Sequence, residues 1–128
     1  MLVAMTAQAA GLPGSPLLAP ESNKFIHNQR LGLVIAKPGV PWTNELFFHV
    51  FNTQAVRKAI HDSASGVKVR DTSPTKIGEI GVAFPTSIKE QKAIVAVLAN
   101  LASETQRLAS HYEQKQGALA ALKKDCSA

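Results

Sequence analysis

The sequence predicts an α+β fold: a small mixed body, residues 1–86, then one long coiled-coil helix, residues 87–124, and a short tail, residues 125–128. Two observations predict this class. Short apolar stretches bounded by glycine and proline alternate with short helical patterns in the body, whereas the last third keeps a single helical spacing without interruption. A body of this size is marginal for a self-sufficient core.

Nine positions in the last third alternate four and three residues apart, which is the spacing of a left-handed coiled coil. These seam positions are Ile94, Leu98, Leu101, Thr105, Leu108, Tyr112, Lys115, Leu119 and Leu122. Pro85 ends the preceding segment, and Ser87 followed by Glu90 forms a capping box. Residues 88–124 contain no proline, so the helix is expected to be about 55 Å long.

The strands of the body are predicted from short apolar runs. Residues 2–6 are strand-like, residues 11–16 form a loop, and residues 31–36 form a buried strand that ends before Pro38. Residues 80–84 alternate apolar and small side chains, as in a half-buried strand that runs into Pro85.

Three short helices are predicted from their caps. Thr43 and Thr53 are N-cap candidates for two helices separated at Asn52, and Ser73 followed by Pro74 starts a third. Residues 63–71 form a loop that leads into a short strand. Arg57 and Lys58 are expected on the exposed side of the second helix.

The net charge of +5 belongs to the body. Residues 24–76 contain eight basic and three acidic residues, a difference of +5, whereas the rest of the chain has six of each. This division favours a body that faces nucleic acid and a helix that faces protein. The alternative is an ordinary surface, on which such a modest basic excess is also common.

Composition argues against a membrane protein and against an enzyme. No apolar run reaches the eighteen residues that span a bilayer, and the alanine-rich start lacks the basic segment of a signal peptide. His49 and His61 have no ligands at metal-binding spacing, and we find neither a phosphate-binding glycine loop nor a nucleophilic triad. We therefore expect no cofactor and no metal. The lone Cys126 favours a reducing, cytoplasmic setting.

The join between body and helix resembles the specificity subunits of type I restriction-modification enzymes. Residues 80–85 (Ile-Gly-Val-Ala-Phe-Pro) and 90–94 (Glu-Gln-Lys-Ala-Ile) are similar to the strand, proline and Glu-Gln helix start of that family. Upstream, Asn28-Gln29-Arg30 before the predicted strand, the helix pair around residues 46–58, and the glycine loop and turn at 65–73 follow in the family's order. The resemblance covers about residues 2–124 and implies a target-recognition-like body.

The chain also departs from that family. Family subunits usually have two target recognition domains and two long helices, whereas this chain has one helix and resembles only the later part of one domain. We therefore expect that the opening segment of that domain is missing and that Met1 is an internal start. Thr86 stands where the family often has a second proline, and the tail does not continue as family helices often do.

The resemblance implies a non-catalytic subunit that reads double-stranded DNA beside methyltransferase subunits, which carry out the chemistry. Bases would be read in the major groove, and the helix would act as a spacer of about 43 Å between half-sites. The candidate DNA-binding residues are Lys24, His27, Asn28, Gln29, Arg30, Lys68 and Arg70. For each basic residue the alternative is a solvated surface charge, and for Asn28 and Gln29 it is local backbone hydrogen bonding.

With one long helix per chain, we expect an antiparallel homodimer. A parallel pair would place Lys115 beside Lys115, whereas the antiparallel register that pairs Leu98 with Leu122 and Leu108 with Tyr112 places Lys115 beside Thr105. Two alternatives are a generic coiled-coil tail and a helix that folds back on its own body. The competing function is a remnant that serves only as an oligomerisation or docking module.

Overall fold

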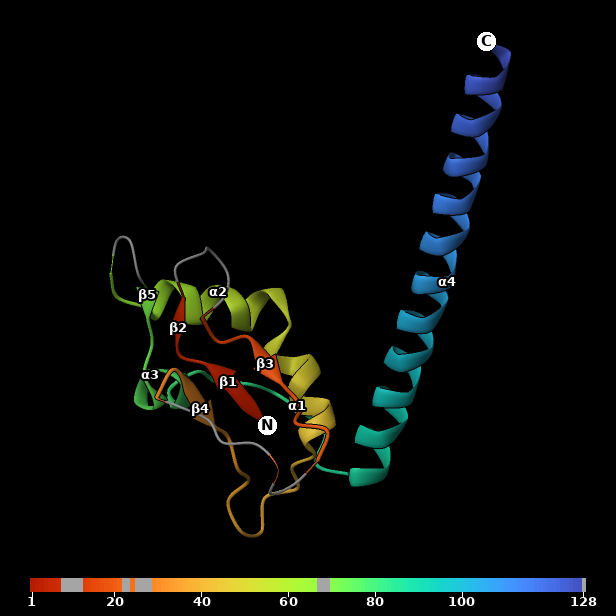
Figure 1. The fold of residues 1–128 in the computed structure, drawn as a ribbon. Coiled ribbons are helices and arrows are strands. Elements are labelled where there is room, and N and C mark those ends of the chain that lie inside the picture. Colours follow the sequence, from red (N-terminus) through yellow and green to blue (C-terminus); the bar gives the residue numbers. More distant parts are fainter. Residues whose placement is uncertain (8–12, 22–23, 25–28, 67–69, 128) are drawn as a thin grey trace. The chain divides into compact units, whose positions relative to one another are not determined.

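The computed structural model in Figure 1 describes residues 1–7, 13–21, 24, 29–66 and 70–127. The chain divides into two compact units, Met1–Lys92 and Ala93–Ala128. The first unit contains the body and the first turn of the long helix; the second is the remainder of that helix. The coarse prediction of a small α+β body followed by a long C-terminal helix is confirmed. Within the described residues, none of the helices combines the length and apolar character that crossing a membrane requires.

Two small antiparallel sheets form the β part of the body. The first has the strand order β3, β1, β4, in which β1 (Leu2–Ala4) lies between β3 (Pro16–Leu17) and β4 (Leu31–Leu33). The second pairs β2 (Thr6–Ala7) with β5 (Arg70–Asp71). The predicted strand at residues 2–6 is thus confirmed, although it is divided into two strands at Met5.

Met5 joins the two sheets through its main chain. Its N–H donates to the carbonyl oxygen of Arg30 at 2.8 Å, and its carbonyl oxygen accepts from the N–H of Thr72 at 2.9 Å. Arg30, just before β4, and Thr72, just after β5, are therefore both hydrogen-bonded to the main chain of Met5. This arrangement satisfies backbone groups that would otherwise need water or side-chain partners.

Three short helices follow the sequence prediction. They are α1 (Asn44–Phe51), α2 (Gln54–Ser63) and α3 (Pro74–Gly78), with the predicted break after α1. The hydroxyl oxygen of Thr53 accepts from the N–H of Val56 at 3.5 Å. Caps of this kind start helices at defined residues because they satisfy N–H groups that lack intrahelical partners.

The core lies where the helices pack against β1. Phe47 of α1, Ile60 of α2 and Val3 of β1 are at most 1 % exposed. The ring of Trp42 stacks on that of Phe47 with centroids 3.2 Å apart, and further apolar side chains pack around this cluster. Gly14, at φ +78°, lies against Ile60, and a Cβ atom there would come within 2.4 Å of the isoleucine Cδ1. Glycine is therefore required at this turn for both backbone and packing reasons.

Two strand predictions in the body need correction. The expected buried strand at residues 31–36 ends at Leu33, and the side chains of Leu33 and Ile35 are 54 % and 77 % exposed. The reason is that successive side chains of an extended segment point to opposite sides: Val34 packs against the core, so its neighbours Leu33 and Ile35 point away from it. Pro16, expected in a loop, lies in β3, an edge position where its missing N–H costs no ladder hydrogen bond.

The segment 80–84 is not a strand. Ile80, Val82 and Phe84 are half-buried while Gly81 and Ala83 are exposed, so the predicted alternation of sides is present. No strand pairing forms with this segment among the described residues, and its apolar side chains pack against the core. Phe84, for example, contacts the edge of the Phe47 ring at a centroid distance of 4.9 Å.

The long helix α4 spans Ile88–Cys126. It begins as predicted, since the N–H of Glu90 donates to the hydroxyl oxygen of Ser87 at 3.4 Å. It ends later than predicted, because Asp125 and Cys126, assigned to the tail, are helical. Neither residue breaks a helix, and the N–H of Ser127 still donates to the carbonyl of Lys124 at 3.3 Å.

Candidate nucleic-acid interface and seam helix

Two of the candidate DNA-binding segments lie side by side in the body. Gln29 and Arg30 form an exposed turn before β4, and Arg70 is the first residue of β5, where it pairs with Ala7. Through Met5, the main chain of Arg30 lies beside that of Thr72, one residue beyond β5. The two segments, forty residues apart in the sequence, thus meet at one edge of the body.

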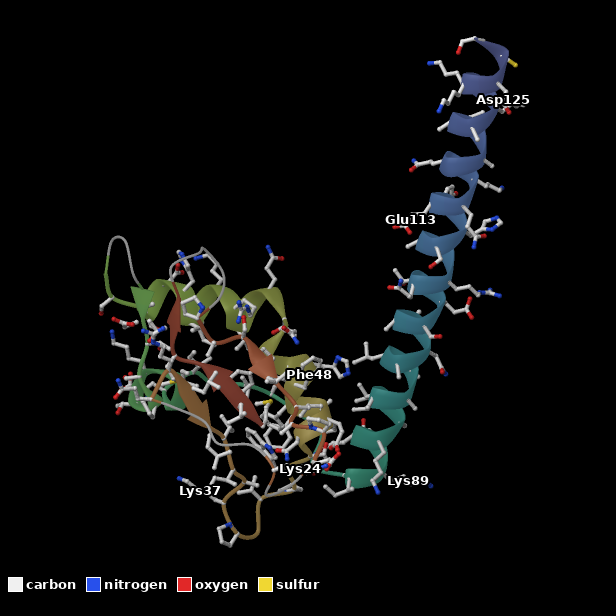
Figure 2. The ribbon with its side chains drawn as sticks, viewed as in Figure 1. Lys24, Lys37, Phe48, Lys89, Glu113 and Asp125 are labelled. Carbon is white, nitrogen blue, oxygen red and sulfur yellow. The ribbon has the colours of Figure 1, made fainter. Side chains whose placement is uncertain are left out.

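The other candidates are not brought to this edge by any described contact. Lys24 is exposed, and its ammonium group binds the carboxylate of Glu21 at 2.5 Å. His27, Asn28 and Lys68 lie outside the described residues, as does the side chain of Arg70. Lys37, which was not a candidate, projects from the loop after β4 (Figure 2).

Lys76 is a basic residue at this edge that sequence reasoning missed. Ser65 and Asp71 exchange two main-chain hydrogen bonds of 3.0 and 2.9 Å, which fixes Ser65 beside β5. The ammonium group of Lys76 donates to the hydroxyl of Ser65 at 2.7 Å, so it lies at the same edge. The Ser73-Pro74 cap located α3 in the sequence, but nothing local indicated that Lys76 of α3 contacts Ser65. The edge formed by residues 29–30, 65, 70–71 and 76 is called the basic edge below.

The two cations of α2 behave differently from each other. Lys58 is exposed, as predicted, and binds Asp62 one turn later. That hydrogen bond, with a smaller one from His61, lowers the pKa of Asp62. Arg57 was expected to be exposed but is half-buried, and burial lowers its pKa. Its Nη1 atom has no hydrogen-bond partner within the described part of the chain. A long aliphatic stem lets arginine lie along apolar surface in this way.

The side chain of Gln91 is buried and fully hydrogen-bonded, and its burial was not predicted. It is 0 % exposed. Its Oε1 accepts from the N–H and the hydroxyl of Thr43 at 3.1 and 2.7 Å, and its Nε2 donates to the carbonyls of Pro41 and Pro85 at 2.6 and 2.7 Å. A side-chain amide has two donor protons and an acceptor oxygen with two lone pairs, so its capacity is fully used.

This network changes the predicted role of Thr43. Thr43 immediately precedes α1, as a cap should, but its hydroxyl makes no cap hydrogen bond to the helix. It is used instead to hold Gln91. The first turn of α4 is consequently fixed to the loop before α1 and to Pro85 by one polar side chain within an apolar setting, where hydrogen bonds to it are difficult to replace.

Most of the α4 seam is exposed in the single chain, whereas Ile94 and Leu98 near its start are half-buried. Leu101, Leu108, Tyr112, Leu119 and Leu122 are 56–68 % exposed, and side chains project around the whole helix (Figure 2). The polar seam residue Thr105 is satisfied internally, because its hydroxyl donates to the carbonyl of Leu101 at 2.8 Å. The seam thus presents large apolar side chains whose burial would be favourable.

The described residues contain no group of three or more histidine, cysteine, aspartate or glutamate side chains that could hold a metal ion. Cys126 is exposed at the end of α4. Neither a family model nor a curated protein nor a solved structure matches this chain in the corresponding searches.

Proposed function

We propose that this chain is a non-catalytic, cytoplasmic DNA-specificity subunit, or part of one, of a type I restriction-modification system. In this proposal the target-recognition-like body binds double-stranded DNA, α4 is a coiled-coil helix that pairs antiparallel with a second copy, and methyltransferase subunits dock alongside. The observation that carries the proposal is the basic edge. Segments singled out separately as DNA-binding candidates are neighbours there, held by the main chain of Met5.

Electrostatics supports the same edge. Arg30, Arg70 and Lys76 come from three different segments of a body that holds the net positive charge of the chain. Arginine and lysine neutralise phosphates, and arginine also reads guanine in the major groove through two hydrogen bonds. Gln29, exposed beside Arg30, carries the amide that pairs with adenine.

A second candidate function is an oligomerisation or docking module that does not bind DNA. The exposed apolar seam favours it, because pairing through α4 needs nothing from the body. Two cations of the body, Lys24 and Lys58, are also bound by carboxylates of their own chain. The two functions share the pairing helix and differ only in whether the basic edge contacts DNA.

DNA binding can be tested by fluorescence anisotropy with the full chain and a pool of random-sequence duplexes, titrated at several salt concentrations between 25 and 200 mM. We expect the logarithm of the binding constant to fall linearly with the logarithm of salt concentration. Arg30→Ala and Lys76→Ala should each reduce the slope by about one, because each removes a cation that neutralises a phosphate. Lys58→Ala, at an exposed position of α2, is the matched control and should leave the slope unchanged.

Absence of binding at the lowest salt would refute the DNA-binding function and favour the oligomerisation module. If Arg30→Ala and Lys76→Ala both kept the salt slope of the unaltered chain, the DNA interface would have to lie elsewhere on the chain.

A further inference from the structure

The seam of α4 continues one position further than the sequence prediction placed it. Because the helix extends to Cys126, the alternation that ends at Leu122 has a tenth position four residues later, at Cys126 itself. In the antiparallel register that pairs Leu98 with Leu122, this tenth position faces Ile94 of the second copy. All ten positions then have a partner, and the pairing is symmetric about position 110.

This symmetry fixes which residues meet at the two-fold axis. In an antiparallel coiled coil, the g position, which directly precedes a core residue at the a position, faces the g position of the other helix, and the spacing puts Tyr112 at an a position. His111 directly precedes Tyr112 and lies within one residue of the centre of symmetry. It is therefore the flanking residue that faces its own copy, with Leu108 and Tyr112 packing beneath the pair.

A second copy is the occupant that the seam itself indicates. The polar layers coincide, since Lys115 meets Thr105, whose hydroxyl is already bonded to the carbonyl of Leu101. The five most exposed seam side chains, at about 100 Å² each, would bury roughly 1,000 Å² over two copies, the area at which specific interfaces begin.

The charged groups around His111 do not offset a positive charge on it. On its own helix Arg107 and Lys115 lie one turn away on either side, and Glu104, two turns away, binds Arg107 at 2.8 Å. The second copy contributes the same groups, together with its own His111 and the hydroxyl of Tyr112. Of all these groups, histidine is the one whose usual titration range falls between pH 5 and 8.

We propose that the α4 dimer is acid-sensitive, because protonation places two His111 cations side by side at its two-fold axis. This inference rests on the pairing described in the proposed function and is independent of DNA binding. Two like charges about 6 Å apart in a solvent-exposed setting would weaken the dimer about threefold. Because the two cations repel each other in the dimer, protons bind the separated helices more readily than the paired ones. Lowering the pH should therefore favour dissociation, so the dimer is expected to be tightest above the titration range of histidine and weakest below it.

The dissociation constant of the full chain can be measured by sedimentation equilibrium at pH 8.0 and pH 5.5, at one ionic strength and with a reducing agent. We expect it to rise about threefold at pH 5.5. His111→Gln should remove this dependence, whereas His49→Gln, on α1, is the matched control and should retain it. A dimer with no pH dependence, or one whose pH dependence survives His111→Gln, would overturn the inference and leave the pairing intact. A chain that stays monomeric at both pH values would overturn the pairing as well.

The register has its own test by air oxidation. Ile94→Cys should give a covalent dimer through Cys126 of the second copy, and adding Cys126→Ser should abolish it. The unaltered chain should stay uncrosslinked, because its two thiols would lie about 48 Å apart. A disulfide between two Cys126 residues in the unaltered chain would instead mean parallel helices and would overturn the placement of His111.

Discussion

Replacing Gln91 by alanine should cost the body about 4 kcal/mol of unfolding free energy. The side chain is wholly buried and makes four hydrogen bonds of 2.6–3.1 Å, each worth about 1 kcal/mol net. Small domains have total stabilities of about 5–15 kcal/mol, so this loss would consume a large part of the total. Thr43→Val, which removes only the hydroxyl bond to Oε1, should cost about 1 kcal/mol and gives a milder step.

Gln91→Glu tests the same network by charge rather than by volume. The introduced carboxylate would face the carbonyl oxygens of Pro41 and Pro85, which the amide nitrogen now contacts at 2.6 and 2.7 Å. Because those oxygens and the burial both disfavour the ionised form, the pKa of the introduced carboxyl should be raised in the folded state. Stability is then lost as pH rises through that value, so the deficit should be smaller at pH 5 than at pH 7.

Urea unfolding followed by Trp42 fluorescence is a suitable assay. Trp42 is the only tryptophan of the chain, and it stacks on Phe47 in the core beside Thr43. Its signal therefore reports the body and not the distal part of α4. Glu90→Gln, at the exposed neighbouring position, should change stability by less than about 0.5 kcal/mol. If Gln91→Ala destabilised the body by less than about 1 kcal/mol, the four hydrogen bonds could not be holding the first turn of α4.

Three further perturbations follow from the packing. Gly14→Ala should lower the unfolding free energy clearly more than Gly39→Ala in the same urea assay. Both glycines have φ near +80°, but only at Gly14 would a Cβ meet the buried isoleucine of α2. Equal losses at the two positions would exclude the steric contribution. Gly78→Ala should stabilise the body by about 0.5–1 kcal/mol, because alanine restricts the unfolded chain more than glycine does. In the folded body its Cβ would meet no atom, since Gly78 lies in the wall of a 190 Å³ apolar cavity. A loss of stability would contradict this prediction. Leu108→Glu should make the chain monomeric in sedimentation, whereas Ser103→Glu, on the face opposite the seam, should not; a dimer that survives Leu108→Glu would exclude the seam as its interface.

Local sequence signals identified most of the helical structure. The caps at Thr53, Ser73 and Ser87 each mark a helix start that the structure contains, because capping depends on residues within one turn of each other. The seam spacing likewise identified α4, although its end was placed two residues early. Helix ends fray, and no stop signal follows Lys124.

The features that the sequence did not reveal depend on contacts between distant segments. Leu33 and Ile35 are apolar yet exposed because they point away from the core against which Val34 packs, and no property of residues 31–36 determines which side is covered. The burial of Gln91 requires carbonyls and a threonine that lie six and about fifty residues away. At the basic edge, likewise, Arg30 could be chosen as a candidate from its charge. Its proximity to β5 follows only from the pairing of Met5.

The way Met5 holds the basic edge affects how freely that edge can change in evolution. Its two bonds, to Arg30 and from Thr72, use main-chain atoms only, so any residue could replace the exposed Arg30 without losing the bond to Met5. Met5 itself is more constrained, because its side chain is buried, at 7 % exposed. The side chains that face outward can therefore diversify while the strands beneath them stay in register. A surface of this kind can acquire a new binding preference through a few substitutions and keep its fold.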